Sequence, residues 1–98
     1  MVVVWSLPAR DDLKSIHAYI ARDSKRYASR VAQDIRDKTK ALLDLPYMGK
    51  VVPEISEPSL REISLYSYCI LYEVMDETIY IHGVIHMRRN FTADDLER

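Results

Sequence analysis

The sequence contains one cysteine, Cys69, and only two glycines among its 98 residues. A single cysteine cannot form an internal disulfide, so the chain is not a disulfide scaffold and we expect it in the reducing cytoplasm. Two glycines cannot supply a glycine-rich phosphate loop, which argues against use of ATP or a dinucleotide and predicts no cofactor. No apolar run reaches the roughly 18 residues of a membrane span, and the first residues lack the basic character and length of a signal peptide. We therefore expect no membrane association.

The composition, with 48% hydrophobic and 30% charged residues, is typical of one soluble globular domain covering residues 1–98. Charge is unevenly distributed, with ten Lys or Arg against six Asp or Glu in residues 10–50, and four against nine in residues 51–98. A sequence pI near 6.3 predicts no direct specific DNA binding by this chain alone, because such binding depends on neutralising several phosphates. The basic residues of the first half fit a solvated helical face better than a local binding patch.

The first half predicts a strand followed by two helices. Residues 2–5 are β-branched or aromatic, which favours a strand. Ser6 can then cap a helix, and Pro8 falls in the first turn, where a missing N–H is tolerated. Two apolar stripes with helical spacing follow, the second interrupted at Lys38 and Thr39 and ended by Pro46. The stripes are Ala9, Leu13, Ile16 and Ile20, and then Ala28, Val31, Ile35, Leu42 and Leu45.

The second half predicts an irregular segment over residues 46–59 and then three strands over 60–65, 68–75 and 78–86. A connection of this length is often functional, although it can be a plain link. In the last strand, strict alternation predicts one face that packs on the helices and one open, aromatic face. The first face would carry Ile79, Ile81, Gly83 and Ile85, and the second Tyr80, His82, Val84 and His86. A final helical turn is expected over 92–96.

This order of elements predicts an α+β fold: an N-terminal strand, a helical hairpin, and a three-stranded antiparallel meander that together form one twisted sheet. The N-terminal strand is expected to join that sheet, because an isolated strand cannot satisfy its backbone groups.

With these elements in place, the sequence resembles the ParE branch of the ParE/RelE superfamily, the toxins of type II toxin–antitoxin modules. The resemblance covers about residues 2–91. It is carried by Trp5-Ser6, Ala9, Asp12-Leu13, Ile16, Tyr19-Ile20, Pro46, Gly49, Leu60-Arg61-Glu62, Tyr68, Ile70, Tyr72, Val84-Ile85-His86 and Arg89. It implies a RelE/ParE-like fold and a small cytoplasmic toxin that forms a hetero-oligomer with a cognate antitoxin. It also implies a role in plasmid or chromosomal stabilisation, with DNA gyrase as the target; RelE members instead cut mRNA in the ribosome.

If the chain is a RelE-like nuclease, the residues that could perform catalysis lie in the last third. A planar guanidinium suits bidentate contact with a phosphate, and histidine titrates in the useful pH range. The candidate catalytic residues are Arg61, His86, Arg88 and Arg89. Arg61 could instead form a structural ion pair with a glutamate, and His86 with Arg89 could close the strand end.

Three observations weaken the nuclease interpretation. Asn90-Phe91 stands where RelE-like nucleases usually carry a tyrosine or another acid–base group, and no lysine follows Lys50. The acidic second half would also be repelled by ribosomal RNA. We therefore favour a toxin that binds a protein target, with an mRNA endonuclease and an inactive antitoxin-binding relative as alternatives. The target-binding candidates are Arg61, Glu62, Tyr80, His82, His86, Arg88 and Arg89.

Other kinds of site find little support in the sequence. His82 and His86 would lie about 13 Å apart on a strand, too far for one metal ion, so no metal site is expected. Cys69 lies in the middle of a strand, where a free cysteine is usually inert core rather than a nucleophile.

Overall fold

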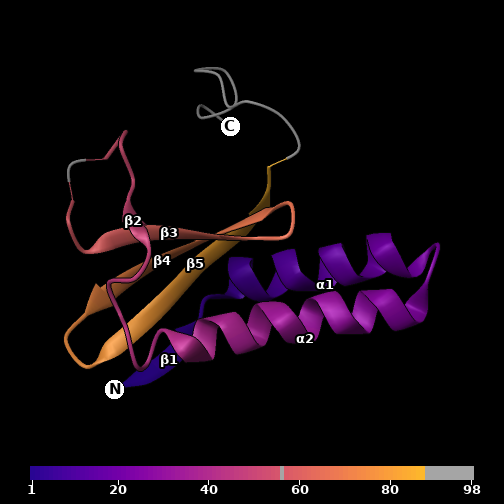
Figure 1. Ribbon diagram of the computed structural model, residues 1–98, viewed down its shortest axis with the longest axis horizontal. Coiled ribbons are helices and arrows are strands. Elements are labelled where there is room, and N and C mark those ends of the chain that lie inside the picture. The colour runs from indigo at the N-terminus through magenta and orange to yellow at the C-terminus, as the bar shows by residue number, and fades with distance from the viewer. Residues whose placement is uncertain (56, 88–98) are drawn as a thin grey trace.

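The computed structural model describes residues 1–55 and 57–87 and contains two helices and five strands (Figure 1). The elements, in chain order, are β1 (Val2–Trp5), α1 (Leu7–Ala21), α2 (Lys25–Ala41), β2 (Lys50–Val51), β3 (Leu60–Leu65), β4 (Tyr68–Met75) and β5 (Thr78–His86). The predicted turn over 92–96 lies outside the described residues. No helix in the described part of the chain combines the length and apolar character needed to cross a bilayer.

The strands form one mixed sheet with the order β1-β5-β4-β3-β2. The meander β3-β4-β5 is antiparallel, as predicted, and β1 joins it by pairing in parallel with β5. The two-residue strand β2 pairs with β3 at the far edge and was not predicted from the sequence. In Figure 1 the two helices lie side by side as one layer against the sheet, so the α+β prediction is confirmed.

Both helices begin at a serine that supplies a side-chain cap. Ser6 Oγ accepts a hydrogen bond from the backbone N–H of Ala9 at 3.1 Å, and Ser24 Oγ accepts one from that of Tyr27 at 3.1 Å. A cap of this kind contributes about 1 kcal/mol, because it satisfies one of the N–H groups left free at a helix start.

The end of α2 differs from the prediction. The helix stops at Ala41 rather than continuing to Pro46, and Leu45, predicted to be in the apolar stripe, is 61% exposed. Thr39, predicted at an interruption of the stripe, is instead 2% exposed. Its hydroxyl donates to the carbonyl of Arg36 at 2.7 Å, which satisfies the buried polar group within the helix.

The core lies between the helical layer and one face of the sheet. Its largest fully buried residues come from α2 and the segment after it, and from β4 and β5; they are Val31, Ile35, Thr39, Leu42, Ile70, Tyr72, Ile79 and Ile81. Alternate residues of β4 face the core, because Tyr68, Ile70, Tyr72 and Val74 all belong to this cluster.

A register shift in β5 overturns the predicted alternation beyond residue 81. Leu71 pairs with Gly83 whereas Tyr72 pairs with Ile81, so His82 is an extra residue on β5, as in a β-bulge. The bulge exchanges the faces that follow it: Val84 is 5% exposed and belongs to the core, while Ile85 is 44% exposed. A strictly alternating pattern places these two residues the other way round.

Candidate functional site

Arg61 on β3 is bound to the segment that connects α2 to the sheet. Its Nε donates to the carbonyl of Pro58 at 2.8 Å, and its Nη1 donates to the carbonyls of Gly49 at 3.1 Å and Tyr47 at 3.3 Å. The guanidinium also lies over the Tyr47 ring, 4.9 Å from its centroid. Arg61 therefore joins both ends of residues 46–59 through backbone carbonyls, rather than through the ion pair with a glutamate considered above.

Tyr72 holds the same segment from inside the core. Its hydroxyl donates to the carbonyl of Pro46 at 2.8 Å and accepts from the N–H of Gly49 at 3.0 Å. Desolvation raises the pKa of Tyr72, so the hydroxyl stays protonated and available as a donor. A Cβ at Gly49 would lie 2.7 Å from both the Glu62 carbonyl oxygen and the Tyr72 hydroxyl, so this position requires glycine for close approach.

Glu62 lies on the face of the sheet opposite the helices. Its carboxylate is 4.0 Å from Lys50 Nζ on β2 and accepts a weak contact from Cys69 Sγ at 3.8 Å. Burial, followed by the nearby Glu62 charge, raises the pKa of Cys69 to about 11. A thiol that remains protonated at neutral pH is a poor nucleophile.

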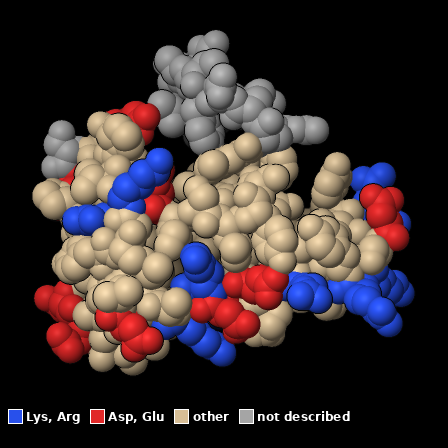
Figure 2. Space-filling model, in the orientation of Figure 1, with Lys and Arg blue, Asp and Glu red and all other residues tan. Residues whose placement is uncertain are grey.

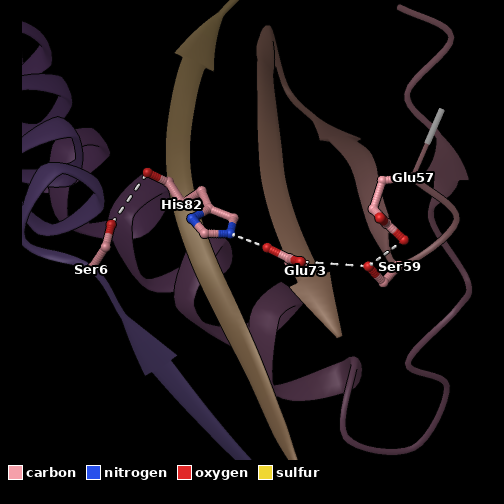
Figure 3. Close-up of polar contacts among 5 residues, drawn as sticks. All are labelled: Ser6, Glu57, Ser59, Glu73 and His82. Atoms are coloured by element: carbon pink, nitrogen blue, oxygen red, sulfur yellow. Dashed lines mark hydrogen bonds and ion pairs between the residues drawn. The ribbon is translucent and has the colours of Figure 1, made fainter. Parts of the chain in front are cut away.

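A line of polar contacts crosses this open face at the bulge (Figure 3). His82 Nε2 lies 2.9 Å from Glu73 Oε1, and Glu73 Oε2 accepts from Ser59 Oγ at 3.5 Å. The same hydroxyl lies 3.3 Å from Glu57 Oε1, and the Tyr80 ring is stacked near His82 with centroids 6.4 Å apart. These contacts connect β5, across β4, to the segment before β3.

His86 does not share that face. It pairs with Tyr68 across the strands, and the two rings meet edge to face with centroids 5.1 Å apart. Because directly paired residues point to the same side of a sheet and Tyr68 belongs to the core cluster, His86 lies on the helix side. The prediction of one open face carrying Tyr80, His82, Val84 and His86 is therefore wrong for Val84 and His86, and the bulge is the cause.

The described candidates for nuclease chemistry do not converge. Arg61 is paired with Tyr72 and His86 with Tyr68, so the two lie four residues apart along β4, or roughly 13 Å, and on strands on opposite sides of it. Arg88 and Arg89 lie outside the described residues. Within residues 1–55 and 57–87, no group of three His, Cys, Asp or Glu side chains could hold a metal ion.

Two residues at the start of the chain form contacts that the sequence patterns did not reveal. β1 ends at Trp5, so beyond this point α1 lies along the edge of β5. Ser6 Oγ donates to the His82 carbonyl at 3.2 Å, and Asp12 Oδ2 accepts from the Val84 N–H at 2.9 Å. These contacts hold the bulge on both sides of Gly83. The only sequence signal was indirect, since Ser6 and Asp12 are among the residues that carry the family resemblance.

Charged side chains of both signs lie along the helical hairpin. Figure 2 shows basic side chains spread along the helical hairpin toward its tip, interrupted by acidic ones. The basic residues of the hairpin, including Arg22 directly after α1, are Arg10, Lys14, Arg22, Lys25, Arg26, Arg30, Arg36, Lys38 and Lys40.

Comparison with known proteins identifies the family of this chain. The model of the ParE toxin of type II toxin–antitoxin systems, parDE, matches residues 3–91. The chain belongs to the ParE toxin family. It is 31% identical over 88 residues to Toxin RelE2 of Caulobacter vibrioides, a match that covers 89% of this chain and 96% of the relative.

A solved structure agrees on the architecture of this ParE/RelE-family toxin. The chromosomal ParDE toxin–antitoxin system from P. aeruginosa contains a chain that superposes with a TM-score of 0.74. The match covers 90% of this chain and 97% of the other, at 23% sequence identity. At that identity the similarity shows the fold.

Proposed function

We propose that this toxin acts by binding and inhibiting DNA gyrase, and that an antitoxin encoded with it neutralises it. The observation that carries the proposal is the separation of the nuclease candidates. General acid–base cleavage of RNA requires its proton-transfer groups and cations within hydrogen-bond reach of one phosphate, about 3 Å. Arg61 is occupied by three carbonyls of its own chain, and His86 packs edge to face on Tyr68.

The charges of the described sheet also favour a protein target. Glu62 and Glu73 lie on the open face, and their carboxylates repel a polyanion such as ribosomal RNA. The same face exposes Met75 and Ile85, at 41% and 44%, toward opposite ends of the β4–β5 pair, with the rings of Tyr80 and His82 between them. A mixed apolar, aromatic and charged surface is typical of protein–protein contacts.

The proposed target surface therefore has its centre on the open face, at Glu62, Tyr80 and His82. Arg61 contributes by holding residues 46–59 in place at one border. His86 lies at the end of β5, and the proposal also includes Arg88 and Arg89, which lie outside the described residues.

Two assays with the purified protein test this function. We expect inhibition of DNA supercoiling by gyrase, together with intact mRNA in a cell-free translation reaction. In cells, expression of the toxin alone should arrest growth with signs of DNA damage before translation stops. Tyr80→Ala should weaken the inhibition of supercoiling, whereas Asp11→Ala, on the exposed face of α1, should not.

Other results would assign a different function. Rapid cleavage of mRNA on translating ribosomes, with supercoiling unaffected, would make the chain a RelE-type endonuclease. Antitoxin binding without either effect would make it an inactive relative that serves as an assembly module.

A further inference from the structure

Two successive carbonyls of β5 point to the same edge of that strand, where Ser6 binds both. The Ile81 carbonyl accepts from the Ser6 N–H at 3.0 Å, and the His82 carbonyl accepts from Ser6 Oγ at 3.2 Å. Figure 3 shows the second bond, on the side of His82 that faces away from Glu73. Consecutive residues of a regular strand direct their carbonyls to opposite sides, so this pair marks the extra residue of the bulge.

The residues after the bulge also fit a straight strand. In the structure Val84 lies opposite Ile70 on the core side, and Ile85 lies opposite Cys69 on the open face. Without the extra residue each position would be filled by the preceding residue, so Val84 would lie on the open face and Ile85 on the core side. Side-chain burial separates the two registers weakly, because each register buries one β-branched residue and exposes the other.

We propose that Ser6 selects the bulged register of β5 and thereby determines which side chains the end of the open face presents. Only this register brings the His82 carbonyl to Ser6, because in a straight strand that carbonyl would point to β4. With the bulge this end of the face carries Ile85; without it, the same end would carry Val84 and His86. The inference rests on the proposed function for the role of the open face in target binding, and makes Ser6 a positioning residue for that surface.

Asp12 supports the bulged strand without selecting it. Its Oδ2 accepts from the N–H of Val84, the residue opposite Ile70. In the straight register Gly83 would lie opposite Ile70 and would direct its N–H to the same edge. Loss of the Asp12 carboxylate should therefore weaken both registers alike, which makes Asp12→Ala the control for a loss of stability alone.

Ser6 also caps α1, so the variants must separate capping from register selection. Its Oγ accepts from the Ala9 N–H at 3.1 Å while it donates to the His82 carbonyl. Ser6→Asp keeps a good helix cap, but an ionised carboxylate has no proton to donate. Ser6→Gly also lacks the donor and is tolerated as a cap, so it provides a second variant. Ser6→Thr keeps both the donor and the acceptor and is the conservative control.

Disulfide formation with Cys69, the one cysteine of the chain, reports the register. Directly opposite residues have Cβ atoms about 4.5–5.5 Å apart, close enough for a disulfide to form. Under mild oxidation with diamide, we expect Ile85→Cys to cross-link faster than Val84→Cys when Ser6 is present. Ser6→Asp and Ser6→Gly should each shift the ratio of the two rates about fivefold toward Val84→Cys, as expected for the loss of one hydrogen bond.

The controls decide whether the shift reports the register. Ser6→Thr and Asp12→Ala should leave the ratio of rates unchanged, although Asp12→Ala lowers the Tm. An unchanged ratio in folded Ser6→Asp and Ser6→Gly would overturn the inference. An equal shift in Asp12→Ala would also overturn it, because the ratio would then follow stability alone.

Deletion of Gly83 provides a rescue. A straight strand that lacks this residue would place Val84 on the core side and Ile85 on the open face, as the bulged strand does. In the deletion variant Ser6→Asp should therefore no longer change the ratio of cross-linking rates, and a shift that persists there would overturn the inference. Cross-linking does not involve gyrase, so a native chain that fails to inhibit supercoiling would count against the proposed function and leave register selection by Ser6 standing.

Discussion

Asp12 on α1 and Val84 on β5, 72 positions apart in sequence, are joined by a hydrogen bond of 2.9 Å from the Val84 N–H to Asp12 Oδ2. The bond lies just beyond the bulge at His82, where β1 has ended and no strand continues along this edge of β5 in the described chain. A helix side chain thus takes the place of a neighbouring strand. A Cβ at position 83 would lie 3.3 Å from the same carboxylate oxygen, so a larger residue there would press against Asp12.

Asp12→Ala should therefore destabilise the fold. Removing the acceptor leaves a part-buried N–H without its partner, at a cost of about 1–3 kcal/mol. For a domain of this size 1 kcal/mol lowers the Tm by about 4–8 °C. Thermal unfolding followed by circular dichroism measures the change. Asp11→Ala, the exposed neighbour on the same helix turn, should change the unfolding free energy by less than about 0.5 kcal/mol. Equal losses in the two variants would contradict this role for Asp12.

Gly49→Ala should release the segment between α2 and the sheet. The added methyl would meet the Glu62 carbonyl oxygen and the Tyr72 hydroxyl at 2.7 Å, so the backbone must move, and we expect a loss of about 1–3 kcal/mol. Combining it with Tyr72→Phe removes one of the two clashes. In a double-mutant cycle measured by urea unfolding, the double variant should therefore lose less unfolding free energy than the sum of the losses of the two single variants. Strict additivity would show that the two groups do not meet.

Arg61→Lys should behave more like Arg61→Ala than like the wild type. An ammonium cannot reproduce donation from two guanidinium nitrogens to three carbonyls, or the stacking on Tyr47. Both variants should lower stability by about 1–2 kcal/mol and increase protease cleavage within residues 46–59. If Arg61→Lys keeps wild-type protease resistance and stability while it loses toxicity, Arg61 contacts the target directly rather than through this segment.

In the alkaline range, the free energy of unfolding should decrease as the pH rises, because of Cys69. Its pKa is raised from 9.0 to about 11 in the folded protein, so the folded state retains a proton that the unfolded state releases. The stability contributed by the protonated Cys69 thiol is complete below pH 9 and is lost as the pH rises toward 11. Urea unfolding at pH 8 and pH 10.5 measures the difference. Cys69→Ala should reduce the change in unfolding free energy between these two pH values. An unchanged difference would show that other groups cause it, including Tyr66, Tyr68 and Tyr72, whose pKa values are also raised.

The order of elements could be predicted from the sequence because each strand and helix carries its own local signal. Apolar spacing located α1, and the alternation of β4 separates its residues into the two faces that the structure shows. Local patterns do not report pairing between distant segments, so the parallel pairing of β1 with β5 and the short strand β2 could not be derived. The bulge at His82 was invisible for the same reason, since its support comes from Ser6 and Asp12 at the other end of the chain.

The candidate site shows the same division between chemistry and placement. Residue types identified Arg61, His82 and His86 as groups able to contact a partner. Only the fold reveals that carbonyls surround Arg61, that His82 contacts Glu73, and that His86 faces the helices. Each of these placements depends on strand register, and one extra residue in a strand is enough to reverse it.

The parallel pairing of β1 with β5 joins two segments that lie far apart in the sequence. Val2 is paired with Thr78, a separation of 76 residues, so the sheet cannot be completed while the chain is still growing through its middle. Contacts this distant in sequence slow folding, because a large loop must close before they form. A chain of this toxin that ends before β5 therefore lacks the strand that connects β1 to the rest of the sheet.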